Sequence, residues 1–220
     1  MTGTTIAGEV SAMAAATADQ PKNELMNAFA NEQAELARQD TPAGVISVGA
    51  VVPDATLLDP YGRETTLYGA LAATPAVIVF YRGAWCPYCN IALRTYQAEL
   101  LPTLNEQGVS LIAISPQAPD GSLSMQEKNE LTFTVLSDPG NKLAREVGIV
   151  SAPSPEARAA QVQLGLDLEA INADGTIAIP MPTTLIVDPG HVVRWVDVHP
   201  NYTTRSEPAE ILDALTSTIG

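Results

Sequence analysis

The stretch PAVIVFYRGAWCPYCN, residues 75–90, contains both cysteines of this 220-residue chain, Cys86 and Cys89. Its first half is a nearly continuous apolar run, which is typical of a strand buried inside a parallel or mixed sheet. A helix is expected to begin near Cys86, to continue to Gly108 and to be kinked or shortened in its last turns by Pro102. The apolar run VSLIAIS at 109–115 then completes a strand–helix–strand unit over residues 76–114. Both thiols are therefore expected at a turn from a buried strand into a helix.

Two cysteines at this spacing are compatible with zinc binding, an inert buried pair or a reversible redox couple. Zinc needs four ligands, and the remaining soft ligands are His191 and His199, which are eight residues apart in a predicted strand hairpin. At a helix start, free backbone N–H groups and the positive end of the helix dipole stabilise a thiolate. Arg82 adds a positive charge nearby. The sequence therefore favours a redox couple, with no metal and no cofactor.

Composition limits the environment and the partners. The net charge of −14 and the pI of about 4.3 argue against binding to nucleic acid, which requires clustered basic residues. No apolar run reaches the length of a membrane span, and the N-terminus has no basic region of the kind that begins a secretory signal. Two cysteines are too few for a secreted disulfide scaffold. We therefore expect a cytoplasmic protein that is not bound to a membrane.

The rest of the chain alternates predicted strands and helices, which indicates one α/β domain. Residues 1–20 are expected to be a mobile tail, and 21–39 a helix with Asp19 as its cap and Pro21 in its first turn. Pro60, Tyr61 and Gly62 are predicted at a hairpin tip. Residues 152–180 are less regular and are interpreted as an insertion. Further elements are predicted as a helix at 122–130, a strand at 133–138, a short helix at 139–149, a strand hairpin at 183–198 and a final helix at 207–220.

The segment WCPYC after a buried strand resembles the thioredoxin-fold active site, with a Pro-Tyr spacer similar to that of glutaredoxins. The chain around it resembles the alkyl hydroperoxide reductase/thiol-specific antioxidant family of peroxiredoxins. That resemblance is carried by VGAVVPDATLLDPYGRETTL, VFYRGAWCPYC, LIAISPQ, FTVLSDPGNKLAREVGI and TTLIVDPGHVVRW, and covers roughly residues 44–215. It implies a thioredoxin-like α/β fold with a central mixed sheet flanked by helices. The implied division is a tail and helix at 1–43, then a redoxin domain at 44–220 with the insertion near 152–180.

The resemblance also exposes departures from the family pattern. Peroxiredoxins place Thr three residues and Pro seven residues before the peroxidatic cysteine; counted back from Cys89, these positions hold Cys86 and Arg82. The family's arginine six residues before the Asp of the late strand is replaced by Pro182, counted from Asp188. In thioredoxin-like reductases this place belongs to a cis-proline facing the cysteines. We therefore predict a cis Met181–Pro182 bond against the cysteine pair.

The resemblance implies a thiol-dependent peroxide reductase that cycles through a Cys86–Cys89 disulfide. Cys89 would attack the peroxide and Cys86 would resolve the sulfenic acid. Thioredoxin, glutaredoxin or a low-molecular-weight thiol would be the reductant, and a homodimer is left open. The residues predicted for catalysis are Cys86, Cys89 and Arg82, and those predicted for substrate binding are Trp85, Pro182 and Thr183.

Two other functions remain open from the sequence. One is a protein thiol-disulfide oxidoreductase, in which Cys86 attacks and Cys89 resolves. The other is a redox-sensing interaction module with little turnover. The segment NYTTR, with Tyr202 and Arg205, is interpreted as a solvated loop in preference to a source of a second arginine for the site.

Overall fold

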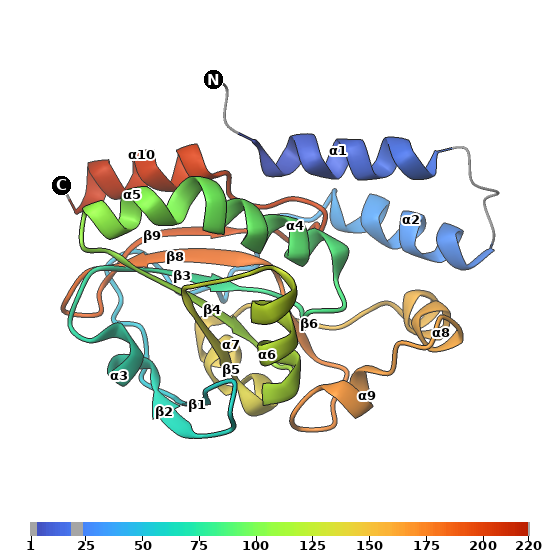
Figure 1. Cartoon of the computed structure of the whole chain (residues 1–220). Coiled ribbons are helices and arrows are strands. Elements are labelled where there is room, and N and C mark those ends of the chain that lie inside the picture. Colours follow the sequence, from blue (N-terminus) through green and yellow to red (C-terminus); the bar gives the residue numbers. More distant parts are fainter. Residues whose placement is uncertain (1–3, 19–23, 220) are drawn as a thin grey trace.

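The computed structural model describes residues 4–18 and 24–219. Within them a seven-stranded mixed sheet has the order β2-β1-β5-β4-β3-β8-β9 (Figure 1). The central strands β3, β4 and β5 are parallel, whereas β8 and β9 extend the sheet antiparallel on one side. The strands are β1 Thr56–Leu58, β2 Glu64–Thr66, β3 Ala76–Phe80, β4 Ser110–Ser115, β5 Thr134–Ser137, β8 Thr183–Val187 and β9 Val193–Val198. This is the predicted thioredoxin-like α/β architecture.

Helices cover both faces of the sheet, as the alternation along β3 requires. Val77 and Val79 pack into one core with α4 (Pro87–Thr95), α5 (Leu101–Glu106) and α10 (Pro208–Thr218). Ile78 and Phe80 point to the other core, with α3 (Leu67–Leu71) and α7 (Lys142–Val147). All five residues of β3 are buried, which explains its unbroken apolar run. The sheet is thus the middle layer, and the chain passes from the inner strand β3 into the turn that contains the cysteines (Figure 1).

The predicted strand–helix–strand unit is confirmed, with one local difference in its helix. The helix after the cysteines passes through a π-helical segment, Tyr96–Leu100, before it resumes as α5. Pro102 lies in the first turn of α5, directly after the π-helical segment, in which Leu101 N–H already bonds five residues back to Tyr96 O. The helix therefore continues through Pro102 to Glu106. The later elements also agree with expectation, with α6 at Pro119–Lys128 and the β8–β9 hairpin turning at 188–191.

The expected mobile tail is wrong for the part that is described. Residues Ile6–Thr17 form the helix α1, which packs against α4. Ile6 is buried in the core, and the backbone N–H groups of Ile6 and Ala7 each donate to the Glu207 carboxylate at 2.8 Å. An apolar anchor and a carboxylate at the helix N-terminus hold this segment on the domain. The predicted cap Asp19 and the first-turn Pro21 lie outside the described residues.

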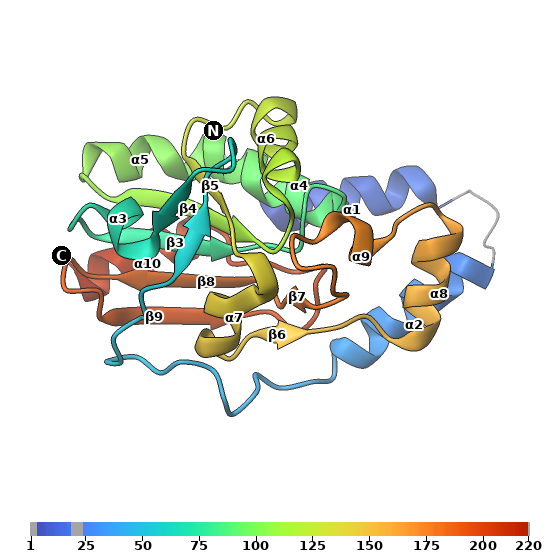
Figure 2. The same ribbon diagram turned by 90° about the horizontal axis from the view of Figure 1, so that it is seen from below.

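Two elements that the sequence places far apart lie side by side. The helix α2 (Glu24–Leu36) runs next to α8 (Pro155–Gln163), beyond the end of the sheet at which β3 passes into α4 (Figure 2). The predicted insertion thus contains α8 and the short α9 (Leu168–Ile171). A two-stranded sheet flanks it, β6 (Val150–Ser151) with β7 (Ile179–Pro180). The division of the chain at residue 43 stays a prediction.

Candidate active site

The turn between β3 and α4 positions the two thiols. Cys86 is the N-cap residue of α4, Pro87 follows at the first helical position, and Cys89 lies in the first turn. The Asn90 side chain fixes the turn by donating to the carbonyls of Ala84, at 2.7 Å, and Cys86, at 2.9 Å. These bonds connect both sides of the turn, so they restrain the cysteines relative to the strand.

Gly83 is required inside this turn. Its φ of +147° is a conformation that L side chains rarely adopt, and a Cβ there would lie 2.4 Å from Trp85 Nε1. The glycine therefore lets the Trp85 ring lie across the turn, beside the cysteines.

Cys89 is the thiol that the site stabilises as an anion. Its Sγ accepts hydrogen bonds from Arg205 Nη2 at 3.1 Å and from the backbone N–H of Arg82 at 3.4 Å. Burial raises the pKa of Cys89, but a hydrogen bond from Cys86, the charge of Arg205 and the bond and charge of Arg82 outweigh it. The net effect is a pKa of Cys89 well below the usual range, which favours the thiolate form of this sulfur.

Cys86 has the opposite character. Burial, the hydrogen bond that it gives to Cys89 and repulsion by the Cys89 charge raise its pKa well above the usual range, against the opposing charges of Arg82 and Arg205. The pair therefore favours the state in which Cys86 keeps its proton and Cys89 carries the charge. A nucleophilic sulfur and a protonated neighbour at a helix N-terminus suit a redox cycle in which the two act in sequence.

Two buried arginines supply the positive charge of the site. Arg82 and Arg205 are 4% and 7% exposed, and neither forms an ion pair with a carboxylate in the described part of the chain. Arg205 also donates to the carbonyls of Tyr202 and Thr204. The Arg82 guanidinium lies 3.8 Å from the centre of the Tyr202 ring and 4.9 Å from that of Trp85. Without carboxylate partners, both charges act on the sulfur.

Arg205 is the functional residue that the sequence analysis missed. The interpretation of NYTTR as a solvated loop is wrong, because Tyr202 and Arg205 are both buried and Arg205 contacts Cys89. The signal that points to it is local: Arg205 lies just before the capping box of α10, at Glu207 and Glu210, which fixes where the loop meets the domain. Nothing in the sequence shows that this fixed end faces the cysteines.

The predicted cis bond before Pro182 is also wrong, since the described residues contain no cis peptide bond. The chain here runs extended from β7 into β8. Met181 N–H donates to Ile149 O at 2.7 Å, and Pro182 O accepts from His199 N–H at 2.8 Å. Bonds on both sides of the peptide hold the extended trans path. The neighbouring Thr183 is buried, and its hydroxyl donates to Met181 O.

A cavity of about 340 Å³ opens onto the site, and we call it the dithiol pocket. Its floor is the turn with Cys86, and its walls come from α2 and from the end of α8 with the residues that follow. The residues that line it are Met26, Phe29, Gln33, Arg82, Trp85, Cys86, Pro87, Tyr88, Gln161, Leu164, Leu166 and Tyr202. The predicted residues Arg82, Trp85 and Cys86 meet here. Pro182 and Thr183 are not among these residues, although Pro182 lines a narrow neighbouring space with Arg82.

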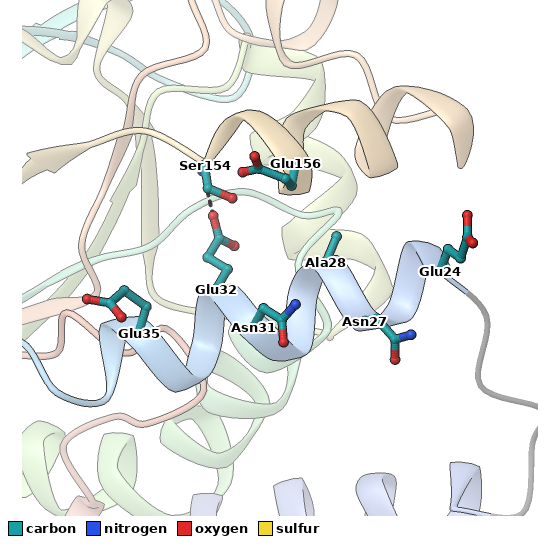
Figure 3. Close-up of a pocket in the computed structure, with 8 residues that line it drawn as sticks. All are labelled: Glu24, Asn27, Ala28, Asn31, Glu32, Glu35, Ser154 and Glu156. Carbon is teal, nitrogen blue, oxygen red and sulfur yellow. Dashed lines mark hydrogen bonds between the residues drawn. The ribbon is translucent and has the colours of Figure 1, made fainter.

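A second cavity, of about 560 Å³, lies between α2 and α8 (Figure 3). Four carboxylates line it, and one of them, Glu32, accepts a hydrogen bond from the backbone N–H of Ser154 at 2.6 Å (Figure 3). Its other oxygen accepts from Tyr202 Oη at 3.0 Å. In the ranges that the structure describes, no three His, Cys, Asp or Glu side chains are grouped to hold a metal. Through these two bonds, Glu32 connects α2 to the start of α8 and to Tyr202 beside the cysteines.

Fold and site together define a thioredoxin-fold dithiol protein. A profile of the AhpC/TSA family matches residues 48–196, so the chain belongs to that family. It is similar to the putative peroxiredoxin bcp of Haemophilus influenzae, with 34% identity over 107 residues, which is 47% of this chain and 66% of that protein. It is also similar to the chloroplastic peroxiredoxin Q of Gentiana triflora, with 31% identity over 104 residues and 47% of each chain covered. The matched part of the chain thus spans about half of one of these relatives and about two thirds of the other.

Solved structures agree with the fold. Reduced Prx3 of Vibrio vulnificus superimposes with a TM-score of 0.62 at 19% identity, covering 78% of this chain and 99% of that one.

None of the helices in the described ranges combines the length and the apolar character that crossing a bilayer requires.

Proposed function

We propose that this protein is a thiol-dependent peroxide reductase in which Cys89 is the peroxidatic cysteine. The observation that carries the proposal is the Cys89 sulfur itself, buried and hydrogen-bonded by the Arg205 guanidinium and the Arg82 N–H. A cysteine attacks as its thiolate, and the site lowers the pKa of this one. The similarity to peroxiredoxin Q and bcp proteins supports the same reaction.

In the first step the Cys89 thiolate attacks one oxygen of the peroxide. The S–O bond forms as the O–O bond breaks, so that sulfur is oxidised to sulfenic acid and the leaving oxygen departs as hydroxide or alkoxide, which takes a proton from water. Arg205 and the Arg82 N–H face the reacting sulfur, where they are placed to stabilise charge that moves onto the oxygens. Both donors belong to the folded site before peroxide arrives.

In the second step Cys86 resolves the sulfenic acid. Once Cys89 is oxidised, its negative charge and its acceptor role are lost, and two of the three causes that raise the pKa of Cys86 disappear. Arg82 and Arg205 then favour the Cys86 thiolate. It attacks Cys89 Sγ, the S–O bond breaks, and hydroxide leaves as water while the Cys86–Cys89 disulfide forms. A thiol donor then reduces the disulfide, in a reducing compartment such as the cytoplasm.

The thiol-disulfide oxidoreductase alternative loses support from the burial of the site. A protein disulfide has to reach Cys86 directly, yet Cys86 is 1% exposed beneath the dithiol pocket. A peroxide is small enough to pass this sulfur and reach Cys89. We therefore assign the Cys86–Cys89 couple to a small oxidant. Separately, we propose that residues 44–220 form the catalytic unit.

The test is stopped-flow fluorescence of the reduced protein with hydrogen peroxide, using Trp85 as the reporter beside the site. We expect a second-order rate constant well above that of free cysteine at the same pH, lost in Cys89→Ser. A rate equal to that of free cysteine would contradict the proposal.

A further inference from the structure

We propose that the dithiol pocket binds a peptide-like, anionic thiol of low molecular weight, which reduces the Cys86–Cys89 disulfide without a protein partner. This rests on the peroxide-reductase cycle proposed above and identifies the class of its reductant. Four observations on the residues around Cys86 lead to it.

The first observation is the roof over the thiols. Besides the two bonds of Glu32, Gln33 Nε2 on α2 donates to Tyr88 Oη at 3.4 Å and to Tyr202 Oη at 3.3 Å. The helix α2 is thus tied to the active-site helix, to the loop before α10 and, through Ser154, to α8. A protein thiol approaches with the surface around it, and this surface would meet α2 before its sulfur reached Cys86. Reduction by a protein therefore requires that these bonds break.

The second observation is the size of the pocket. At about 340 Å³ it falls at the lower end of the roughly 300–1,000 Å³ found for small-molecule sites. That volume accepts a thiol of a few residues but no folded domain. Cys86 lines the pocket and Cys89 does not, so an entering thiol meets the Cys86 sulfur first.

The third and fourth observations concern what the pocket presents to a ligand. Arg82 lines it as a buried cation without a carboxylate partner among the described residues, so the pocket suits a carboxylate. Gln161 is 3% exposed, and its buried Oε1 has no hydrogen-bond partner within the ranges that the structure describes. A buried acceptor without a donor is costly, and an amide N–H or an ammonium group of a ligand would satisfy it. A carboxylate together with an N–H donor is the chemistry of a peptide-like thiol.

The reaction follows from this placement. The ligand's thiolate attacks Cys86 Sγ, the Cys86–Cys89 bond breaks, and its electron pair leaves on Cys89, which the arginines stabilise as a thiolate. A second thiolate attacks the ligand sulfur of the mixed disulfide and releases Cys86, which takes up a proton. In sum, two small thiols are oxidised to their disulfide and the protein disulfide becomes a dithiol.

The experiment starts from the full chain oxidised with diamide, so that it does not depend on the peroxide reaction. Reduction is followed by quenching with an alkylating reagent and counting free thiols by mass spectrometry. The probes are glutathione as an anionic peptide thiol, 2-mercaptoethanol as a neutral thiol, and a bacterial thioredoxin. We expect glutathione to reduce the protein faster than the other two at equal thiolate concentration, with a rate that saturates.

Variants at the pocket mouth provide a matched comparison. Leu164 and Val162 are both 53% exposed, but only Leu164 lines the pocket. Leu164→Glu should slow reduction by glutathione about three- to tenfold through charge repulsion, with 2-mercaptoethanol little changed, and Val162→Glu should behave as the parent. Gln161→Leu should slow glutathione about fivefold or more, whereas the exposed control Gln163→Leu should not.

The inference is overturned if thioredoxin reduces the parent faster than glutathione, or if Leu164→Glu and Val162→Glu have equal effects. The peroxide assay is separate. A protein that glutathione reduces as expected, but that peroxide does not oxidise, would refute the proposed function and keep the assignment of the pocket.

Discussion

Replacing Arg205 tests how the site activates Cys89. Arg205→Met keeps much of the side-chain volume but removes the guanidinium whose Nη2 lies 3.1 Å from Cys89 Sγ. Hydrogen bonds to charged groups contribute about 1.5–3 kcal/mol, which corresponds to about one to two pKa units. We therefore expect the pKa of Cys89 to rise by that amount. The peroxide rate constant should fall about ten- to a hundredfold, because the same guanidinium is placed to stabilise the charge that moves onto the oxygens in the transition state.

The assay is a pH titration of thiolate ultraviolet absorbance in a Cys86→Ser background, so that Cys89 is the one thiol that titrates. Stopped-flow kinetics with peroxide run beside it. Arg94→Met is the matched control, because Arg94 is an exposed arginine on the same helix as the cysteines. Arg205 also binds two backbone carbonyls, so thermal melting must show that Arg205→Met is folded. The reasoning is refuted if the folded variant titrates and reacts like the Arg94→Met control.

Three further outcomes are expected. The peroxide rate constant should stay near its plateau as the pH falls below about 8.5, the value of a free thiol, because the lowered pKa keeps Cys89 ionised; a steady decline from that pH downward in a pH–rate profile would contradict it. Glu32→Ala should cost about 1–3 kcal/mol and speed hydrogen exchange in α2, since it leaves two donors unpaired, whereas the exposed Glu35→Ala should do neither. Gly83→Ala should destabilise the protein by at least about 2 kcal/mol in denaturant unfolding, through its positive φ and the contact with Trp85; an unchanged midpoint would show that the turn tolerates a Cβ.

The parts of the fold with a strong local pattern could be predicted from the sequence. The apolar run of β3, the helix after it and the hairpin turns carry their own periodicity and turn residues, so the strand–helix–strand unit and its cysteines follow directly. The helix α1 lacks such a pattern. It is held by Ile6 and by a carboxylate about two hundred residues later, Glu207, and such a contact leaves no local trace.

The residues of the site likewise fall into those that a local motif predicts and one that it does not. Cys86, Cys89 and Arg82 are contiguous, so one motif contains them. Arg205 reaches the same sulfur from 116 positions away, because the loop before α10 returns to the end of the sheet. By comparison with the family pattern, Pro182 occupies the position at which relatives have an arginine. In the structure, the guanidinium that contacts Cys89 belongs to Arg205, from another part of the chain.

The central claim is that Cys89 attacks peroxide and Cys86 resolves it. The most direct test is mass spectrometry of Cys86→Ser and Cys89→Ser after one equivalent of hydrogen peroxide, with a reagent that traps sulfenic acid. The account predicts sulfenic acid on Cys89 in Cys86→Ser and an unmodified Cys86 in Cys89→Ser. Sulfenic acid on Cys86 in Cys89→Ser, with none on Cys89 in the other variant, would contradict it.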